Sequence, residues 1–305
     1  MPFRLIVAIN GLDEEDVTLS GRYMPIVMLT KTVREALCEH AGLRQPFLDL
    51  LHHVYKNSNV KATLEEVRYR HPDDEDIRYF FRWRFPNIRL VTSKGGAEFE
   101  WGYTNVGVDA ACDDNVQIAY QLAECLMLSA KSAPYRQRID ASQIIASYIA
   151  VLLHELAHRL LVWWSRGNCR TPDLGPLLRE SGRFIEEAFL GGVLEGWWAK
   201  DKGGDFEHLR KVIIRTQSGR FLELDEYSAT AFYKRFNTST THIPLSHEVA
   251  MAEAFLGDPA KTSRAKINHG IMLDTSDHDS SVTSSSSPIG LGITRCPIIN
   301  DTRRL

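Results

Sequence analysis

The sequence lacks a strong excess of charge of either sign. Its 36 Lys and Arg residues nearly balance 39 Asp and Glu residues, which gives a formal net charge of −3. A protein that binds nucleic acid or an anionic membrane through its overall field carries a clear basic excess, so we expect neither partner. The stretch DIRYFFRWRF at 76–85 mixes arginines with aromatic rings, but the acidic residues at 73–76 cancel its field. We therefore favour arginines packed on rings over a nucleic-acid surface there.

Paired cysteines are absent as well. The five cysteines are scattered and show no C-x-x-C spacing: Cys38, Cys112, Cys125, Cys169 and Cys296. The N-terminal stretch MPFRLIVAINGLDEED has a short apolar run that soon meets acidic residues, unlike a secretory signal. An odd number of cysteines without a signal peptide favours free thiols in a reducing compartment, so we expect a cytoplasmic protein.

No apolar run is free of interruption over the length that a bilayer requires. The best candidate, 144–164, contains two histidines, a glutamate and an arginine, so we expect no membrane-spanning segment. The sequence contains no internal repeat. From residue 274 the hydrophobic pattern gives way to DTSDHDSSVTSSSSP, and we expect 274–305 to form a disordered tail.

The most informative stretch that is present runs from 147 to 164 and reads SYIAVLLHELAHRLLVWW. It is strongly apolar and has no proline or glycine, which predicts a helix. Within it, His154 and His158 are four residues apart and share a helical face, so both imidazoles can point at one spot. Two histidines at this spacing make half of a zinc site. Glu155 follows the first histidine, where its carboxylate could hold a metal-bound water.

Chance produces this H-E-x-x-H motif in roughly one chain of this length in a hundred. The alternative is a core helix whose polar residues are satisfied by hydrogen bonds. Two histidines and a glutamate are poor choices for an apolar helix without partners, which favours the metal site.

A zinc hydrolase site needs a third protein ligand. The next predicted helix, at 177–200, offers three candidates, Glu180, Glu186 and Glu187. Glu180 follows His158 at a spacing that allows one loop and an antiparallel return. Glu187 shares the face of Glu180 but lies about 10 Å further along the axis, and Glu186 points about 120° away. Glycines at 182, 191, 192 and 196 would each cost this helix about 1 kcal/mol, so close approach to another element or to the site is expected.

This part of the chain resembles the zincin metallopeptidases, and more narrowly the gluzincin arrangement of H-E-x-x-H on one helix and a ligand glutamate on the next. It is also similar to uncharacterised fungal proteins that continue with G-E-S-G-x-x-x-E-x-x-x-F-G-G. Here the segment at 179–192 is RESGRFIEEAFLGG, with Arg179 at the first glycine and Leu190 at the phenylalanine. The resemblance covers 144–192, under a fifth of the chain. It implies that Glu180 is the third ligand, with Glu186 in reserve.

The constellation implies Zn²⁺ as cofactor, with His154, His158 and Glu180 as ligands and Glu155 as the general base. Zinc lowers the pKa of its bound water to about 7. Glu155 then accepts the proton, the hydroxide attacks a peptide carbonyl, and Glu155 returns the proton to the leaving amine. Four downstream residues are candidates for stabilising the oxyanion: Tyr227, Tyr233, His242 and His247.

We therefore expect a zinc metallopeptidase that acts on a peptide or protein substrate. The alternatives are a non-peptidase zinc hydrolase or biosynthetic enzyme on the same scaffold, or a catalytically inactive, metal-stabilised binding protein. The retained Glu155 favours an enzyme, because an inactive scaffold has no need of that carboxylate. The oligomeric state is left open.

The expected fold is α+β, a mainly helical zincin-like domain with a small mixed or antiparallel sheet and the H-E-x-x-H helix at its active site. An N-terminal part, 1–140, includes VQIAY at 116–120 as a strand at the edge of the cleft, and 141–273 of the same domain carries both ligand helices. The H-E-x-x-H helix should run over 142–164, with N-cap candidates at 140–142. Further expected helices are 30–41, 45–55 and 246–256, and expected strands are 5–8, 211–216 and 220–224.

Overall fold

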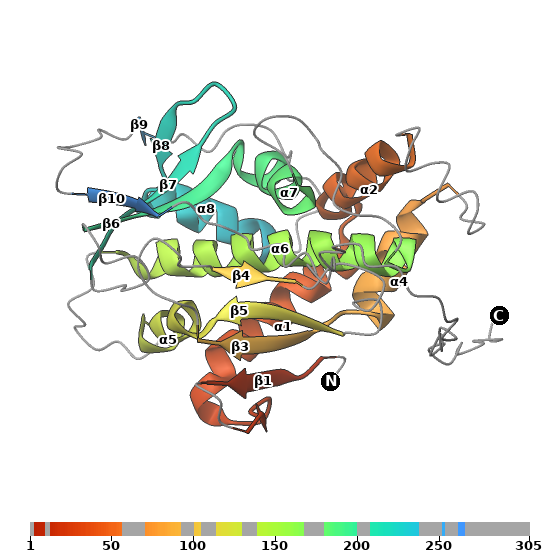
Figure 1. Cartoon of the computed structure of the whole chain (residues 1–305), viewed down its shortest axis with the longest axis horizontal. Coiled ribbons are helices and arrows are strands. Elements are labelled where there is room, and N and C mark those ends of the chain that lie inside the picture. Colours follow the sequence, from red (N-terminus) through yellow and green to blue (C-terminus); the bar gives the residue numbers. More distant parts are fainter. Residues whose placement is uncertain are drawn as a thin grey trace, which may run out of the picture.

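The computed structural model describes most of the chain between residues 3 and 237 and two short strands beyond it. The described residues are 3–9, 13–56, 71–92, 101–104, 114–129, 139–167, 180–199, 208–237, 252–253 and 262–265. They form seven α-helices and two five-stranded sheets, one mixed and one antiparallel (Figure 1). The expected mainly helical α+β class is confirmed. The expected tail at 274–305 lies outside the described residues.

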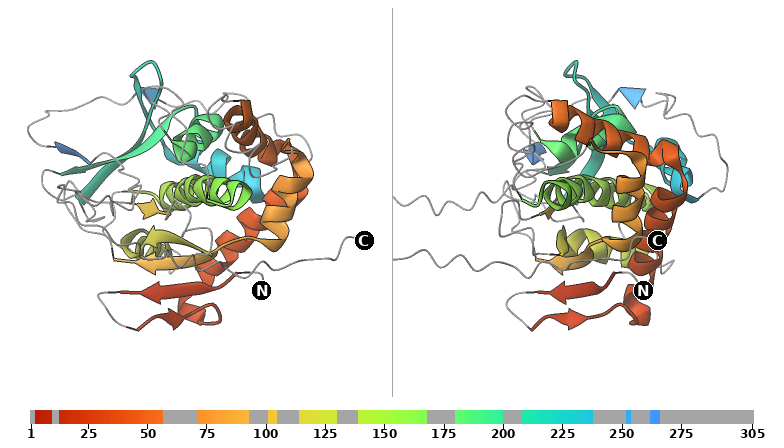
Figure 2. Two further views of the ribbon diagram at one scale, coloured as in Figure 1. Left: turned by 45° about the vertical axis from the view of Figure 1, so that its right-hand side comes forward. Right: turned by 90° about the vertical axis from the view of Figure 1, so that its right-hand side faces the viewer.

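The long helix α6 (Ala141–Ser165) carries the H-E-x-x-H motif and lies between two layers (Figures 1 and 2). Its N-terminus is fixed by a capping box, in which Asp140 accepts from Ser142 N at 2.7 Å and Asp140 N donates to Gln143 at 2.8 Å. Its C-cap, Arg166, is left-handed with φ 52°. Most of the helix is buried, because apolar side chains surround it on all sides.

By length and composition alone, α6 is long and apolar enough to cross a membrane. However, 94 % of its most apolar window is buried inside the structure. The core helix of a folded domain passes the same test of length and composition. The apolar surface of α6 is therefore accounted for by packing against its neighbours.

Sheet A has the strand order β2-β1-β3-β5-β4. Its strands are β1 (Leu5–Ala8), β2 (Glu15–Asp16), β3 (Asn87–Val91), β4 (Gly102–Tyr103) and β5 (Asn115–Ala119). The three central strands are parallel, and β2 and β4 pair antiparallel at the two ends. VQIAY forms strand β5 as expected, but this strand pairs on both sides, and β4 is the end strand of the sheet; its place at the edge of a cleft stays a prediction. Alternating apolar residues indicate a strand but not its neighbours.

Helices α5 (Tyr120–Ser129) and α8 (Glu226–Asn237) pack directly on α6, and three further helices pack against one another beside them: α1 (Met24–Glu39), α2 (Ala41–Lys56) and α4 (Asp74–Trp83). The expected helices at 30–41 and 45–55 are present, but both begin earlier. Pro46 lies inside α2, not in its first turn. The aromatic stretch DIRYFFRWRF is mostly helix α4, which begins with a capping box at Asp73.

The expected helix at 177–200 is wrong in its second half. Helix α7 (Ser181–Leu190) ends at Gly191, whose φ of 73° suits glycine alone, and strand β6 (Val193–Ala199) follows. A continuous apolar run does not distinguish a helix from a buried strand. Arg235 of α8 donates to Phe189 O at the end of α7 at 3.0 Å, and burial lowers the pKa of this guanidinium.

Sheet B is antiparallel, with the strand order β10-β6-β7-β8-β9. Its other strands are β7 (Leu209–Arg215), β8 (Phe221–Glu223), β9 (Ala252–Glu253) and β10 (Thr262–Ala265). The two expected strands at 211–216 and 220–224 are confirmed as β7 and β8. The expected helix at 246–256 is wrong at 252–253, which pair with β8, and its other residues lie outside the described part. The ring of Trp101, just before β4, contacts that of Trp198 in β6 at 5.6 Å between centroids and joins the two sheets.

Candidate metal site

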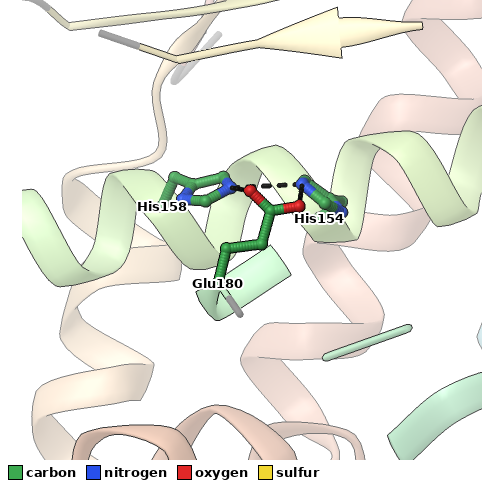
Figure 3. A group of neighbouring side chains, drawn as sticks. All are labelled: His154, His158 and Glu180. Carbon is green, nitrogen blue, oxygen red and sulfur yellow. Dashed lines mark hydrogen bonds and ion pairs between the residues drawn. The ribbon is translucent and has the colours of Figure 1, made fainter. Parts of the chain in front are cut away.

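The N-terminus of α7 brings Glu180 against the two histidines of α6. Glu180 is the N-cap of α7 and lies 4 % exposed. Its Oε1 lies 3.6 Å from His154 Nε2, and its Oε2 lies 3.8 Å from His158 Nε2 (Figure 3). The two Nε2 atoms are 3.1 Å apart. Ligand atoms of all three residues lie within 4.8 Å of one another, so the group could hold a metal ion.

The other nitrogen of each imidazole is held by α7. His154 Nδ1 lies 2.5 Å from Glu186 Oε1, and Glu186 Oε2 accepts from Leu194 N at 2.6 Å. His158 Nδ1 lies 2.8 Å from Ser181 Oγ. Because an ionised carboxylate only accepts, His154 Nδ1 carries the proton and leaves the Nε2 lone pair facing the group. Hydrogen bonds to the distal nitrogen fix the orientation of metal-ligating histidines in the same way.

This donor set fits zinc. Tetrahedral zinc holds nitrogen and oxygen donors at about 2.0–2.2 Å, which places the donors roughly 3.3–3.6 Å from one another. The observed separations of 3.1, 3.6 and 3.8 Å bracket that range. Two nitrogen lone pairs and a carboxylate converge here away from water. Such groups repel one another unless a cation or a proton lies between them. A bound metal ion meets this requirement.

Gly182 shapes the wall of this site. A Cβ at this position would lie 2.1 Å from both Cδ2 and Nε2 of His154. The close approach of α7 to the imidazole therefore requires glycine. This confirms the expectation that a glycine in this segment marks contact with the site. Gly196 is in similarly close contact with the Trp198 ring, away from the group.

Glu155 is fully buried and lies against Gly102 of β4, a strand on a different side of α6 from α7 in Figure 1. Its Oε2 accepts a hydrogen bond from Thr104 Oγ1 at 2.7 Å. A Cβ built on Gly102 would lie 3.0 Å from its Oε1. Strand β4 therefore contacts the carboxylate that the sequence suggests as a general base.

Arg183 places a cationic group beside Glu180. Its Nε lies 3.0 Å from Glu180 Oε1, one helical turn along α7. Sequence reasoning missed Arg183, Ser181 and Thr104 as residues of the site. Arg183 and Ser181 lie within the segment 179–192 that resembles the fungal proteins, and this resemblance was a signal that could have identified them. Thr104 carries no sequence signal.

The other sequence candidates lie elsewhere. Glu186 contacts the Nδ1 side of His154, away from the converging Nε2 atoms, and Glu187 is not part of the group. Tyr227 is 73 % exposed, and Tyr233 packs against the hydrophobic core. His242 and His247 lie outside the described residues.

No family model matches the chain, and no curated protein or solved structure matches it significantly. The resemblance to zincins therefore gains no support from these comparisons. The structure itself shows a buried His/His/Glu group on α6 and α7 that could bind a metal ion.

Proposed function

We propose that the protein is a zinc-dependent hydrolase that cleaves peptide bonds. The observation that carries this proposal is the convergence of His154, His158 and Glu180, with both imidazoles held through Nδ1 so that both Nε2 atoms face the carboxylate. These three residues would hold the ion. When bound, zinc supplies a Lewis acid and lowers the pKa of water to about 7.

Glu155 supplies the proton transfer in this proposal. It adjoins the ligand His154 in sequence but does not belong to the converging group, so its carboxylate stays available as a base. Its carboxylate takes a proton from the attacking water and later gives it to the leaving amine. The carboxylate is fully buried, so neighbouring protein groups and not bulk water determine its orientation.

The edge strand β4 supports a peptide as substrate. It pairs with β5 on one side, and among the described strands its other side is unpaired. An extended chain can add to such an edge through main-chain hydrogen bonds. Because Gly102 of β4 lies against Glu155, a peptide on that edge would pass close to the base.

Burial of the whole group favours a second candidate, a metal-stabilised protein without catalysis. His154 is 0 % and His158 3 % exposed, as in a closed structural site. A structural zinc has four protein ligands, whereas the described residues contribute three here. The peptidase proposal therefore accounts better for the donor set and for Glu155.

Cleavage of a broad peptide library by zinc-loaded protein tests the proposal. Glu155→Gln keeps the shape of the side chain and removes its basicity, so turnover should fall by about 10²–10⁴-fold at equal zinc content. Equal rates for the two proteins would show that Glu155 takes no part. If zinc-loaded wild type cleaves no peptide, ester or amide, the binding-protein candidate replaces the enzyme.

A further inference from the structure

We propose that Thr104, the residue that follows strand β4, is a positioning residue for the base and holds the Glu155 carboxylate in its working orientation. This inference rests on the proposed function, since it deepens the role given to Glu155. Nothing in the sequence motif points to Thr104, which lies far from α6 along the chain.

The contact between the two side chains is short and buried. Thr104 Oγ1 donates to Glu155 Oε2 at 2.7 Å, and its distance to the backbone oxygen of Glu155 is much longer, at 3.5 Å. Thr104 is 3 % and Glu155 0 % exposed. A hydroxyl that donates to a carboxylate away from water makes one of the stronger hydrogen bonds in proteins. Since a threonine has few χ1 states, the donor is itself held in place.

Gly102 completes the slot that receives the carboxylate. Residues two apart in an extended chain point to the same face, so 102 and 104 both face α6. Thr104 binds Oε2, while the missing side chain of Gly102 leaves room at Oε1, where a Cβ would lie 3.0 Å away. That Cβ would also lie 2.9 Å from Gln117 O of β5, which cannot move easily. Thr104 thus orients one carboxylate oxygen, and Gly102 leaves room for the other.

The Glu155 carboxylate is therefore already oriented before a ligand binds. A glutamate side chain loses considerable rotamer freedom when it is fixed. If Thr104 fixes it in advance, any ligand that hands a proton to Glu155 gains affinity or rate from that orientation. Removing the hydroxyl of Thr104 should therefore lower the affinity for such a ligand about tenfold to a hundredfold, which is the usual contribution of a hydrogen bond to a charged group.

Acetohydroxamic acid is a suitable probe, because it binds a metal ion through two oxygens after its N–O–H proton passes to the base. Its dissociation constant is measured on the cobalt-substituted full-length protein from the visible absorption of the ion. The variants are Thr104→Val, which removes the donor at equal size, Thr104→Ser, which keeps it, Glu155→Gln, and the double variant Thr104→Val/Glu155→Gln. Metal content and circular dichroism are matched before comparison.

We expect Thr104→Val to weaken binding at least about tenfold and Thr104→Ser to stay within about twofold of wild type. The double variant should bind no more weakly than Glu155→Gln alone, because Thr104 acts only through Glu155. Additive losses would mean that Thr104 is merely structural, and wild-type affinity in Thr104→Val would overturn the inference outright. If Thr104→Val does not bind the metal ion, the affinity for the probe is compared between Thr104→Ala, which lacks the hydroxyl donor, and Thr104→Ser, which keeps it.

The same experiment separates failure of this inference from failure of the proposed function. If Glu155→Gln weakens the probe while Thr104→Val does not, only the role of Thr104 is lost. If Glu155→Gln binds as wild type does, or if wild type does not bind the probe at all, the proposed function fails and the inference with it.

Discussion

Replacing Gly182 by alanine adds one methyl group directly against a proposed zinc ligand. The new Cβ would lie 2.1 Å from Nε2 of His154, where ordinary carbon contacts are about 3.5–4.0 Å. The imidazole or the helix would therefore have to move by more than about 1 Å. The imidazole has little freedom to turn away, because its Nδ1 is held by Glu186 at 2.5 Å.

This displacement is large compared with what a zinc site tolerates. Ligand distances in metal sites vary within about 0.2 Å, so a shift of 1 Å removes His154 as a ligand or distorts the site. We expect zinc affinity to fall by at least about 10–100-fold, the loss seen when only the groups that orient a ligand are removed. Overpacking should also reduce the free energy of unfolding by about 1–3 kcal/mol.

Zinc affinity is measured by competition with a chromophoric chelator, and stability by thermal unfolding of the metal-free protein. Gly42→Ala is the matched control, because a Cβ on Gly42 meets nothing within 4 Å in helix α2. It should leave zinc affinity unchanged and add up to about 1 kcal/mol of stability. Wild-type zinc affinity in Gly182→Ala would refute the packing of α7 against His154 and with it the role of His154 as a ligand.

Three further predictions follow from the site and its surroundings. Metal analysis of purified protein should find about one zinc per chain in wild type and none in His158→Ala, whereas stoichiometric zinc in the variant would contradict the ligand set. In chelator competition, Glu180→Gln should lower the zinc affinity more than Glu186→Gln does. Glu186 only supports His154 through Nδ1, so its loss should lower the affinity by about 10–100-fold. The reverse order would make Glu186 the ligand. Burial and a hydrogen bond with Tyr23 raise the pKa of Tyr120 to about 12. The stability that this tyrosine contributes is therefore fully present below about pH 10 and should be lost as the pH rises from about 10 through about 12. Denaturant midpoints between pH 9 and 12 should fall less steeply in Tyr120→Phe, and an equal slope would show that this tyrosine is not buried.

Local signals on α6 were sufficient to predict it from sequence. Its beginning was marked by the N-cap candidates at 140–142, and the observed helix, Ala141–Ser165, matches the expected range of 142–164 within one residue at each end. The spacing of His154 and His158 predicted that they face one spot, because helical periodicity alone determines it. Glu180 was identified by resemblance to a motif, and the structure places it beside both imidazoles.

Features that depend on long-range pairing were not predictable in this way. The apolar stretch after Gly192 was assigned to a helix, yet it pairs with β7 along its length, and no local pattern shows that partner. Strand β4 was not predicted because two residues, Gly102–Tyr103, show no periodicity. Thr104 was missed for the same reason, since its role depends on β4 lying against α6 and not on its neighbours in sequence.

The arrangement divides the work of the site between two sides of α6. Helix α7 contributes Glu180, the side chains that hold both imidazoles, and Gly182, which lets α7 approach α6. Substitutions there should change metal affinity first. Gly102 of β4 and Thr104, which follows this strand, both contact Glu155, so substitutions there should change proton transfer while zinc remains bound. A protein that used the ion only for stability would require the α7 side but would have no need to orient a buried carboxylate from β4. In the proposed function, the hydrogen bond from Thr104 orients the one residue of the motif that a purely structural metal site does not use.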